Sequence, residues 1–231
     1  AQVLADLISK MHDENGKVML PGFYDHVKPL PDAERAELAK YSTTEAEYLS
    51  QTGAPALWGE KDYSPSERIG ARPTLEVNGI LSGFTGEGSK TIIPTRAMAK
   101  ISTRLVPDQK PELVYEQLSA FLQANAPKTV RWELKDLSYG SPSISDTTMP
   151  ATKALAAAFE EVWGTSPAFK REGGSVPVVA DMQEILEIDS VLTGFGLPDD
   201  RIHSPNEKLD LPTWKKGVHA LIHFFNNVKR Q

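Results

Sequence analysis

A nearly continuous apolar run at residues 190–195 leads into a loop rich in Gly, Pro and Asp that contains His203. Strands of a parallel sheet covered on both faces are apolar throughout, so the run predicts a buried strand of an α/β domain. Such folds place reacting groups in loops at the carboxyl ends of strands, and imidazole is the commonest protein ligand for metals. His203 is therefore a candidate site residue, and a hydrogen-bonded loop histidine is the structural alternative.

Helical patterns surround this predicted strand. Residues 150–163 are predicted to form a helix with an apolar stripe on one face, which ends at Gly164. A second helix follows Gly173, and a third covers residues 212–228. The stripe predicted to be buried on the third helix consists of Trp214, Val218, Leu221, Ile222 and Phe225. Because roughly 90 residues cannot cover both faces of a parallel sheet, residues 141–231 are expected to be the C-terminal part of an α/β domain whose other half lies upstream of Ala1.

The N-terminal part has a different pattern. Alternating residues predict strands at 73–79, 97–106 and 130–137, and helices are expected at 1–11, 32–50 and from Pro111 onward. The helix from Pro111 has an apolar stripe of Val114, Leu118, Phe121 and Leu122, and residues 51–72 are predicted to be irregular. This order indicates an antiparallel sheet with helices on one face, an α+β layer. A Gly-, Ser- and Pro-rich linker follows, so the predicted domains are residues 1–140 and 141–231.

Composition excludes several classes of function. The 231 residues carry a net charge of −6 with the charges interspersed, which gives no electrostatic reason to expect nucleic acid or an anionic membrane as a partner. No run reaches the roughly 20 apolar residues of a membrane span. The chain has no cysteine, so disulfides, thiolate zinc sites and a cysteine nucleophile are all excluded.

Two motifs are near misses. The glycine-rich segment at residues 83–88 is followed by Ser89 and Lys90, whereas a phosphate-binding loop needs the lysine directly after its last glycine. A nucleotide-binding protein is therefore a poor alternative. His219 and His223 have the i, i+4 spacing of a zinc helix, but Ala220 stands where the hydrolytic motif has glutamate. Both histidines are predicted to face solvent.

Two further features have a functional and a structural interpretation. Arg104 lies within a predicted strand on the face of Ser102, where it could be a solvated charge or bind a carboxylate in bidentate fashion. Glu172 precedes two glycines and Ser175 at a helix start. Glycines there let backbone N–H groups approach an anion, but a plain turn is the alternative.

Several separated strings resemble one family, the aminoacylase/carnosinase-type di-metal peptidases, and are closest to its dipeptidase branch. They are residues 71–80, 86–94, 99–107, 170–177 and 194–208. The family also includes glutamate carboxypeptidase and succinyl-diaminopimelate desuccinylase. The resemblance implies an α/β catalytic domain interrupted by a lid, or dimerisation, domain. Residues 1–140 would be most of the lid, and residues 141–231 the C-terminal segment of the catalytic domain.

The resemblance also implies roles in substrate binding. Arg104 is similar to the lid arginine that holds the substrate carboxylate, and Thr91 to a residue that touches substrate across the dimer. Gly174 and Ser175 fall in the loop that contacts substrate, and Glu172 belongs to the same loop. The substrates would be dipeptides or small N-acyl amino acids that carry a free carboxylate.

For the metal centre, the resemblance implies two divalent ions, zinc in the first place, with manganese or cobalt as alternatives. His203 resembles the last metal ligand, while the general base and the remaining ligands precede Ala1 in the family pattern. The expected protein is a cytoplasmic homodimer joined through its lid, and this chain alone is expected to be inactive. A non-catalytic dimerisation module with an incomplete metal site is the alternative.

Overall fold

A computed structural model describes residues 1–173 and 176–229, apart from the side chain of Tyr41. The chain divides into two compact units. The first contains Ala1–Ser143 and Lys170–Ala180, and the second contains Ile144–Phe169 and Asp181–Gln231. The domain limits expected from the sequence, 1–140 and 141–231, stay a prediction.

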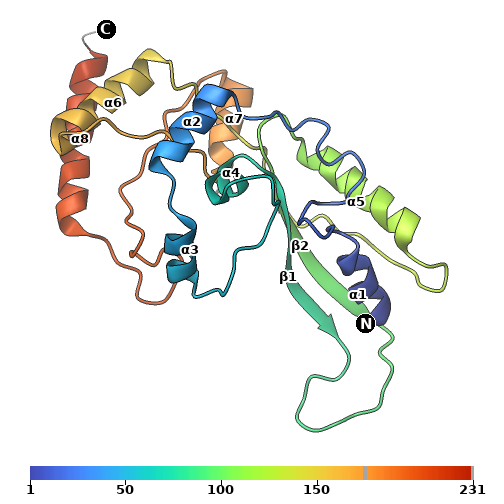
Figure 1. Ribbon diagram of the computed structural model, residues 1–231. Coiled ribbons are helices and arrows are strands. Elements are labelled where there is room, and N and C mark those ends of the chain that lie inside the picture. The colour runs from blue at the N-terminus through green and yellow to red at the C-terminus, as the bar shows by residue number, and fades with distance from the viewer. Residues whose placement is uncertain (174–175, 230–231) are drawn as a thin grey trace. The chain divides into compact units, whose positions relative to one another are not determined.

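The first unit is built on an antiparallel hairpin of β1 (Thr74–Ser82) and β2 (Ala97–Arg104) (Figure 1). Thr74 lies opposite Arg104, and the register shifts between Val77 and Gly79. Since alternate residues of a strand face opposite sides, Arg104 shares a face of the hairpin with Thr74 and Glu76. The predicted antiparallel sheet with helices is confirmed.

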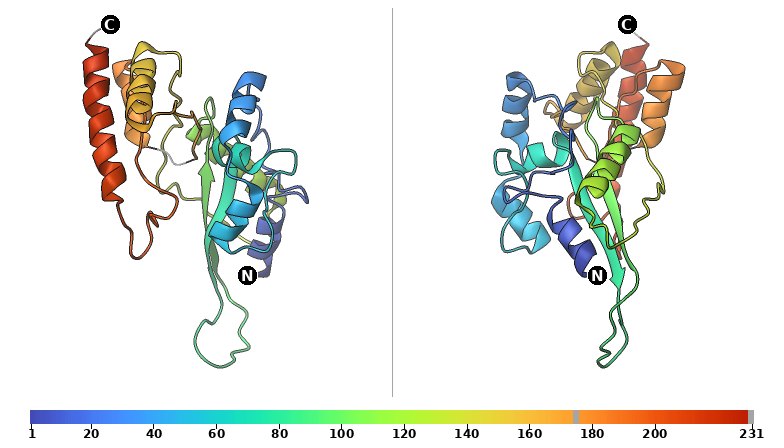
Figure 2. Two further views of the ribbon diagram at one scale, coloured as in Figure 1. Left: turned by 60° about the vertical axis from the view of Figure 1, so that its left-hand side comes forward. Right: turned by 90° about the vertical axis from the view of Figure 1, so that its right-hand side faces the viewer.

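The core of the first unit lies on the other face of the hairpin. The helix α5 (Pro111–Asn125) runs along the sheet in both views of Figure 2 and packs Val114, Leu118 and Phe121 around Leu75. The segment after α1 (Gln2–Ser9) completes this core with four buried side chains, those of Met11, Val18, Leu20 and Phe23. The apolar residues predicted to lie on one face of α5 thus lie in the core.

Three short helices follow α1: α2 (Asp32–Tyr41), α3 (Glu45–Thr52) and α4 (Pro65–Gly70). The single helix expected over residues 32–50 is therefore wrong. A new helix begins at Thr44, whose side chain accepts from the Glu47 backbone N–H while the Glu47 carboxylate accepts from the Thr44 N–H. Such a capping box provides acceptors for backbone N–H groups at the start of a helix, which inside a continuous helix would donate to the preceding turn. The same arrangement at Ser64 starts α4, where the sequence predicted no regular structure.

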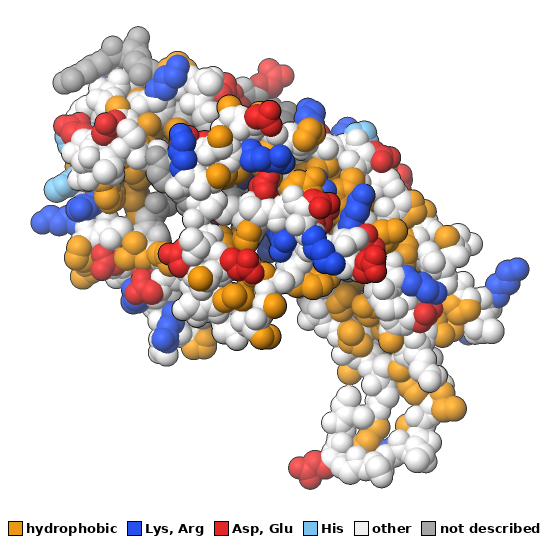
Figure 3. Space-filling view, in the orientation of Figure 1, with side chains coloured by type: hydrophobic (Ala, Val, Ile, Leu, Met, Phe, Trp, Pro, Cys, Tyr) orange, Lys and Arg blue, Asp and Glu red, His pale blue; other side chains and the backbone are white. Residues whose placement is uncertain are grey.

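The free end of the hairpin projects from the first unit (Figure 1) and exposes several large apolar side chains. These are Ile80, Leu81, Phe84, Ile92, Ile93 and Met98, of which Ile93 is 90 % exposed. Figure 3 shows that the visible face of this end is mostly apolar or uncharged, with an acidic side chain at its tip. We call this end of the hairpin, residues 80–98, the hairpin arm.

In the second unit, α6 (Pro150–Trp163) and α8 (Leu211–Val228) lie side by side (Figure 2). Gly164 ends α6 in the left-handed conformation, as its position predicted. The rings of Phe159, Trp163 and Phe195 are stacked, with centroids of Phe159 and Trp163 4.9 Å apart. A third helix, α7 (Pro177–Leu186), spans the limit between the two units.

The packing of α8 differs from the prediction. The stripe expected to be buried is largely exposed, with Trp214 51 % and Phe225 62 % accessible. The buried residues are instead Gly217, which has no side chain, and Ala220, whose side chain is one methyl group, so neighbouring groups can approach closely. His223, predicted to face solvent, is partly exposed and pairs with Glu161 of α6 at 2.9 Å, whereas His219 is exposed as expected.

Two predicted strands are not found. Residues 130–137 and 190–195 have no sheet partner among the described residues. A strand exists only where its backbone groups pair with a neighbour, and here none pairs with them. Leu134 still packs on the core of the first unit, and its carbonyl accepts from the Tyr115 hydroxyl at 3.1 Å.

Candidate functional site

Arg104 ends β2 at the rim of a cavity of about 210 Å³ in the first unit. The cavity is also lined by His12, by Trp58 and by Glu76 of β1. The guanidinium of Arg104 makes no hydrogen bond or ion pair with another described residue, and the side chain is exposed. An unpaired guanidinium beside an open cavity can accept a carboxylate through two parallel hydrogen bonds.

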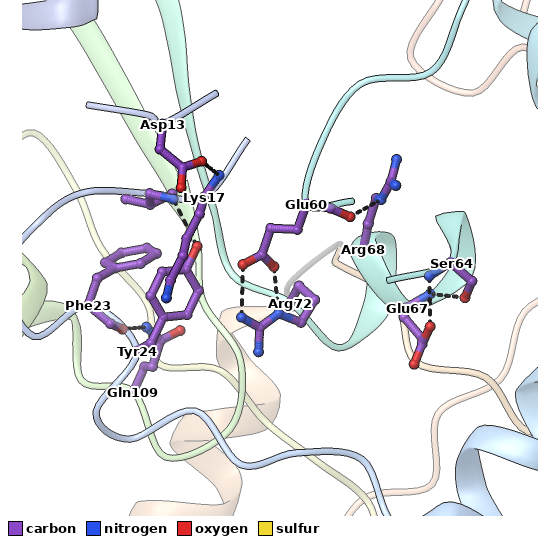
Figure 4. Close-up of polar contacts among 11 residues, drawn as sticks. Asp13, Lys17, Phe23, Tyr24, Glu60, Ser64, Glu67, Arg68, Arg72 and Gln109 are labelled. Carbon is purple, nitrogen blue, oxygen red and sulfur yellow. Dashed lines mark hydrogen bonds and ion pairs between the residues drawn. The ribbon is translucent and has the colours of Figure 1, made fainter. Parts of the chain in front are cut away.

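An ion pair between Arg72 and Glu60 also lines the cavity, and its hydrogen bonds are drawn in Figure 4. The Arg72 guanidinium donates to both oxygens of Glu60 at 2.6 and 2.9 Å, and both side chains are 11 % exposed. The rings of Tyr24 and Tyr63 lie 4.9 and 4.2 Å from the same guanidinium. Although burial opposes the charge, the Glu60 carboxylate holds the pKa of Arg72 above its ordinary value. Neither charge of this pair is available to a ligand.

His12 and Trp58 form one wall of the cavity. Their rings meet edge to face with centroids 5.2 Å apart, and His12 pairs with Val18 in an isolated bridge. Burial lowers the pKa of His12, against the opposing effect of the Glu76 carboxylate, so the imidazole is neutral at pH 7. The sequence did not identify His12 as a site residue, because the neighbouring Asp13 and Glu14 form no pattern with it that indicates a site. Glu76 comes close only through the fold.

The loop of residues 170–173 belongs to the first unit and is held firmly there. Arg171 donates to both oxygens of Glu34 at 2.5 and 2.7 Å, and a Cβ on Gly173 would lie 2.7 Å from the Ile69 carbonyl oxygen. Glu172 is exposed and pairs with Lys170. The other two residues predicted for this loop, Gly174 and Ser175, lie outside the described residues.

Thr91 is exposed in the hairpin arm and does not line the cavity beside Arg104. The preceding glycines, Gly83 and Gly88, have positive φ angles of 76° and 84°. In the described part of the chain the connection continues into β2 and no helix follows it, so it lacks the helix N-terminus of a phosphate-binding loop. The arrangement supports the rejection of nucleotide binding.

His203 lies in the second unit, in a tight loop organised by Asp200. The Asp200 side chain is 2 % exposed and accepts from the Leu197 N–H at 2.7 Å and the Lys208 ammonium at 3.0 Å. His203 has φ 62°, and Arg201 and Asn206 have similar positive values. Non-glycine residues in this conformation are uncommon and cluster at functional sites. The loop thus displays an exposed imidazole on a strained backbone.

The surroundings of His203 do not form a metal centre by themselves. In residues 1–173 and 176–229, no group of three or more His, Cys, Asp or Glu side chains is placed to hold an ion. The nearby Glu207 carboxylate accepts from the backbone N–H of His203 at 3.2 Å. Because a two-metal centre needs bridging and flanking carboxylates as well as histidines, these residues fit one ligand of such a centre, and the centre needs others.

The loop is expected to loosen in acid. The Leu197 N–H and the Lys208 ammonium lower the pKa of Asp200 below its ordinary value. The stabilisation is therefore complete above the unfolded pKa of about 3.9, and is lost as pH falls through the lower folded value. Hydrogen-exchange protection of the Leu197 amide should fall over this range. Asp200→Asn should lower protection at pH 7, and protection that stays constant in acid would contradict the assignment.

Within the described residues, no helix is both long and apolar enough to cross a membrane. Comparison with protein families matches residues 8–227 to peptidase family M20/M25/M40. The chain is 32% identical to the Cys-Gly metallodipeptidase of Candida albicans over 97% of its own length and 48% of that protein. It is 29% identical to the human Beta-Ala-His dipeptidase over 96% of its length and 44% of that protein. The chain thus spans about half the length of these relatives.

Comparison with solved structures finds the same fold in related enzymes. An M20-family metallo-carboxypeptidase from Sulfolobus solfataricus has a TM-score of 0.86 at 30% identity, covering 96% of this chain and 51% of that chain. Human carnosine dipeptidase 1 has a TM-score of 0.83 at 27% identity, covering 100% and 49%. The fold expected from the sequence, an antiparallel sheet with helices followed by part of an α/β domain, matches about half of these enzymes. With nearly its whole length matched, the chain belongs to peptidase family M20/M25/M40.

Proposed function

We propose that the complete protein is a metal-dependent hydrolase of dipeptides or small N-acyl amino acids with a free carboxylate. The observation that carries this proposal is the unpaired Arg104 guanidinium at the rim of a cavity. Relatives of this chain are named as a Cys-Gly metallodipeptidase and a Beta-Ala-His dipeptidase, which supports the substrate class.

Arg104 would bind the substrate by its carboxylate and orient it. A carboxylate at the end of the substrate would accept two hydrogen bonds from the guanidinium, and this contact fixes the distance from Arg104 to the scissile amide. Because the hairpin fixes the backbone of Arg104 opposite Thr74, the carboxylate is held by a rigid element. Thr91, Glu172, Gly174 and Ser175 are proposed to complete substrate binding.

The metal is proposed to be a pair of divalent ions, with zinc first and manganese or cobalt as alternatives. Bound ions of this kind polarise a carbonyl and lower the pKa of water. His203 would contribute an imidazole, and its exposure in the 197–208 loop supports that role. We assign no catalytic step to this chain alone, because its described residues fit one ligand of the centre.

Association is proposed at two surfaces. The hairpin arm exposes apolar side chains, and the outer edges of β1 and β2 have no strand partner among the described residues, which supports a homodimer through the lid. On α8, Trp214, Ile222 and Phe225 are more than half exposed. We propose that the other half of a catalytic domain covers them in a complete, cytoplasmic enzyme.

The test is hydrolysis of an unmodified dipeptide by the purified complete protein, after an intact-mass measurement has established its length. Treatment with a chelator should abolish the activity, and added Zn²⁺, Mn²⁺ or Co²⁺ should restore it. The same dipeptide with a C-terminal amide is the matched control and should be a poor substrate. A dimer without hydrolysis under any of these metals would favour the non-catalytic dimerisation module instead.

A further inference from the structure

The cavity beside Arg104 contains a second charge that the proposed function does not use. Glu76 of β1 lines the cavity and is exposed, and its carboxylate makes no hydrogen bond or ion pair with another described residue. Glu76 lines the same cavity as the His12 and Trp58 rings, and its carboxylate opposes the lowering of the His12 pKa by burial. The cavity therefore offers an unpaired cation and an unpaired anion.

The other charges that line the cavity have partners within the first unit. Arg72 and Glu60 are paired with each other (Figure 4). Arg68 donates from Nε to the Glu60 carbonyl at 2.7 Å and lies against Gly59. When a ligand carboxylate is bound to Arg104, the remaining formal charges of the cavity lining are those of Arg68 and Glu76, and they sum to zero. Net charge then does not select among ligand side chains, so direct contacts with the lining residues decide which one binds.

The hairpin register fixes the spacing between the two unpaired groups. Arg104 lies opposite Thr74, and Glu76 lies opposite Ser102, so Arg104 and Glu76 are diagonal neighbours on one face. Diagonal neighbours of an antiparallel pair are about 7–8 Å apart. Since both side chains are long, they can contact the two ends of one extended amino acid, the α-carboxylate and the terminal side-chain cation.

The remaining wall suits a planar or aliphatic cation. Trp58 presents an aromatic ring, Val18 and Leu75 are apolar, and the His12 imidazole is neutral at pH 7. Aromatic rings attract guanidinium and ammonium groups. The cavity has a volume of about 210 Å³, which is sufficient for one side chain.

We propose that this cavity binds the side chain of a basic C-terminal residue, with its α-carboxylate on Arg104 and its guanidinium or ammonium on Glu76. The inference rests on the proposed function for the peptide nature of the substrate. It makes Glu76 a specificity-determining residue that selects arginine or lysine at the C-terminal position over neutral residues of the same size.

Binding of free amino acids tests the cavity without requiring catalysis. Titration calorimetry on the complete protein should show that L-arginine binds roughly ten-fold more tightly than L-citrulline, its neutral isostere, since a hydrogen bond to a charged group contributes at least that factor. Glu76→Gln should remove the difference and leave citrulline binding unchanged. Glu116→Gln is the matched control, because this exposed carboxylate lies on α5, which covers the opposite face of the hairpin.

Hydrolysis of dipeptides ending in arginine or citrulline separates this inference from the proposed function. Equal binding of the two amino acids to the unsubstituted protein, or absence of binding, overturns the inference even when dipeptides are hydrolysed. A preference for arginine that depends on Glu76 supports it. If that preference is found and no dipeptide is hydrolysed with any metal, the cavity assignment stands and the proposed function is wrong.

Discussion

Replacement of Arg104 by alanine in the complete protein is expected to raise KM about 30-fold or more for dipeptides with a free C-terminal carboxylate. Loss of one partner from a hydrogen-bonded charge pair costs about 2–5 kcal/mol, and about 1.4 kcal/mol is a factor of ten. The guanidinium has no other partner among the described residues, so its removal leaves the protein's own contacts intact. Steady-state kinetics on a series of dipeptides measure the effect.

Two controls make this result specific. Lys100→Ala removes a positive charge from the same face of β2, outside the cavity, and should leave KM unchanged. Arg104→Lys keeps the charge and should restore only part of the affinity, because lysine lacks the bidentate geometry. C-terminal amides should respond little to either substitution at Arg104. Kinetics that do not change in Arg104→Ala would refute the carboxylate-binding role.

Replacement of Arg72 by methionine is expected to destabilise the first unit by about 3–5 kcal/mol, since the substitution leaves a buried carboxylate without its partner. Glu60 and Arg72 are each 11 % exposed and hydrogen-bond at 2.6 and 2.9 Å. The melting temperature of the complete protein should therefore fall. Thermal unfolding followed by calorimetry measures this change.

A second substitution distinguishes charge from packing. When Glu60 is also replaced by methionine, most of the stability should return, because a buried ion pair exchanged for apolar side chains is often nearly neutral. Lys10→Met breaks the exposed pair with Asp6 and should cost at most about 1 kcal/mol. If Arg72→Met lowers the melting temperature no more than Lys10→Met does, the ion pair does not stabilise the unit.

Local patterns were sufficient to predict the elements that form the hairpin and its cover. The alternation around Leu75 and at residues 97–106 predicted strands, and the spacing from Val114 to Phe121 predicted α5 with its buried face. These predictions succeed because side-chain period follows directly from backbone geometry. The sequence placed Arg104 within the strand at residues 97–106, and the structure shows that β2 ends at Arg104.

The cavity beside Arg104 could not be predicted in this way. Its walls come from the segment after α1, from an irregular stretch around Trp58 and from β1, which are separated by tens of residues. No local period links His12 to Glu76. A tryptophan beside a glycine in an irregular stretch was the available signal in the sequence, and it does not identify the other groups.

The sequence by itself determined the two strands of the hairpin and α5 with its buried face. It also placed Arg104 within a predicted strand and His203 after an apolar run. Tertiary structure decided which faces are buried, as α8 shows. Its apolar stripe, including Trp214 and Phe225, is exposed, while Gly217 and Ala220 are buried. The reason is physical: periodicity records which side chains favour burial, whereas burial also requires a neighbouring surface, which only packing within the folded chain supplies.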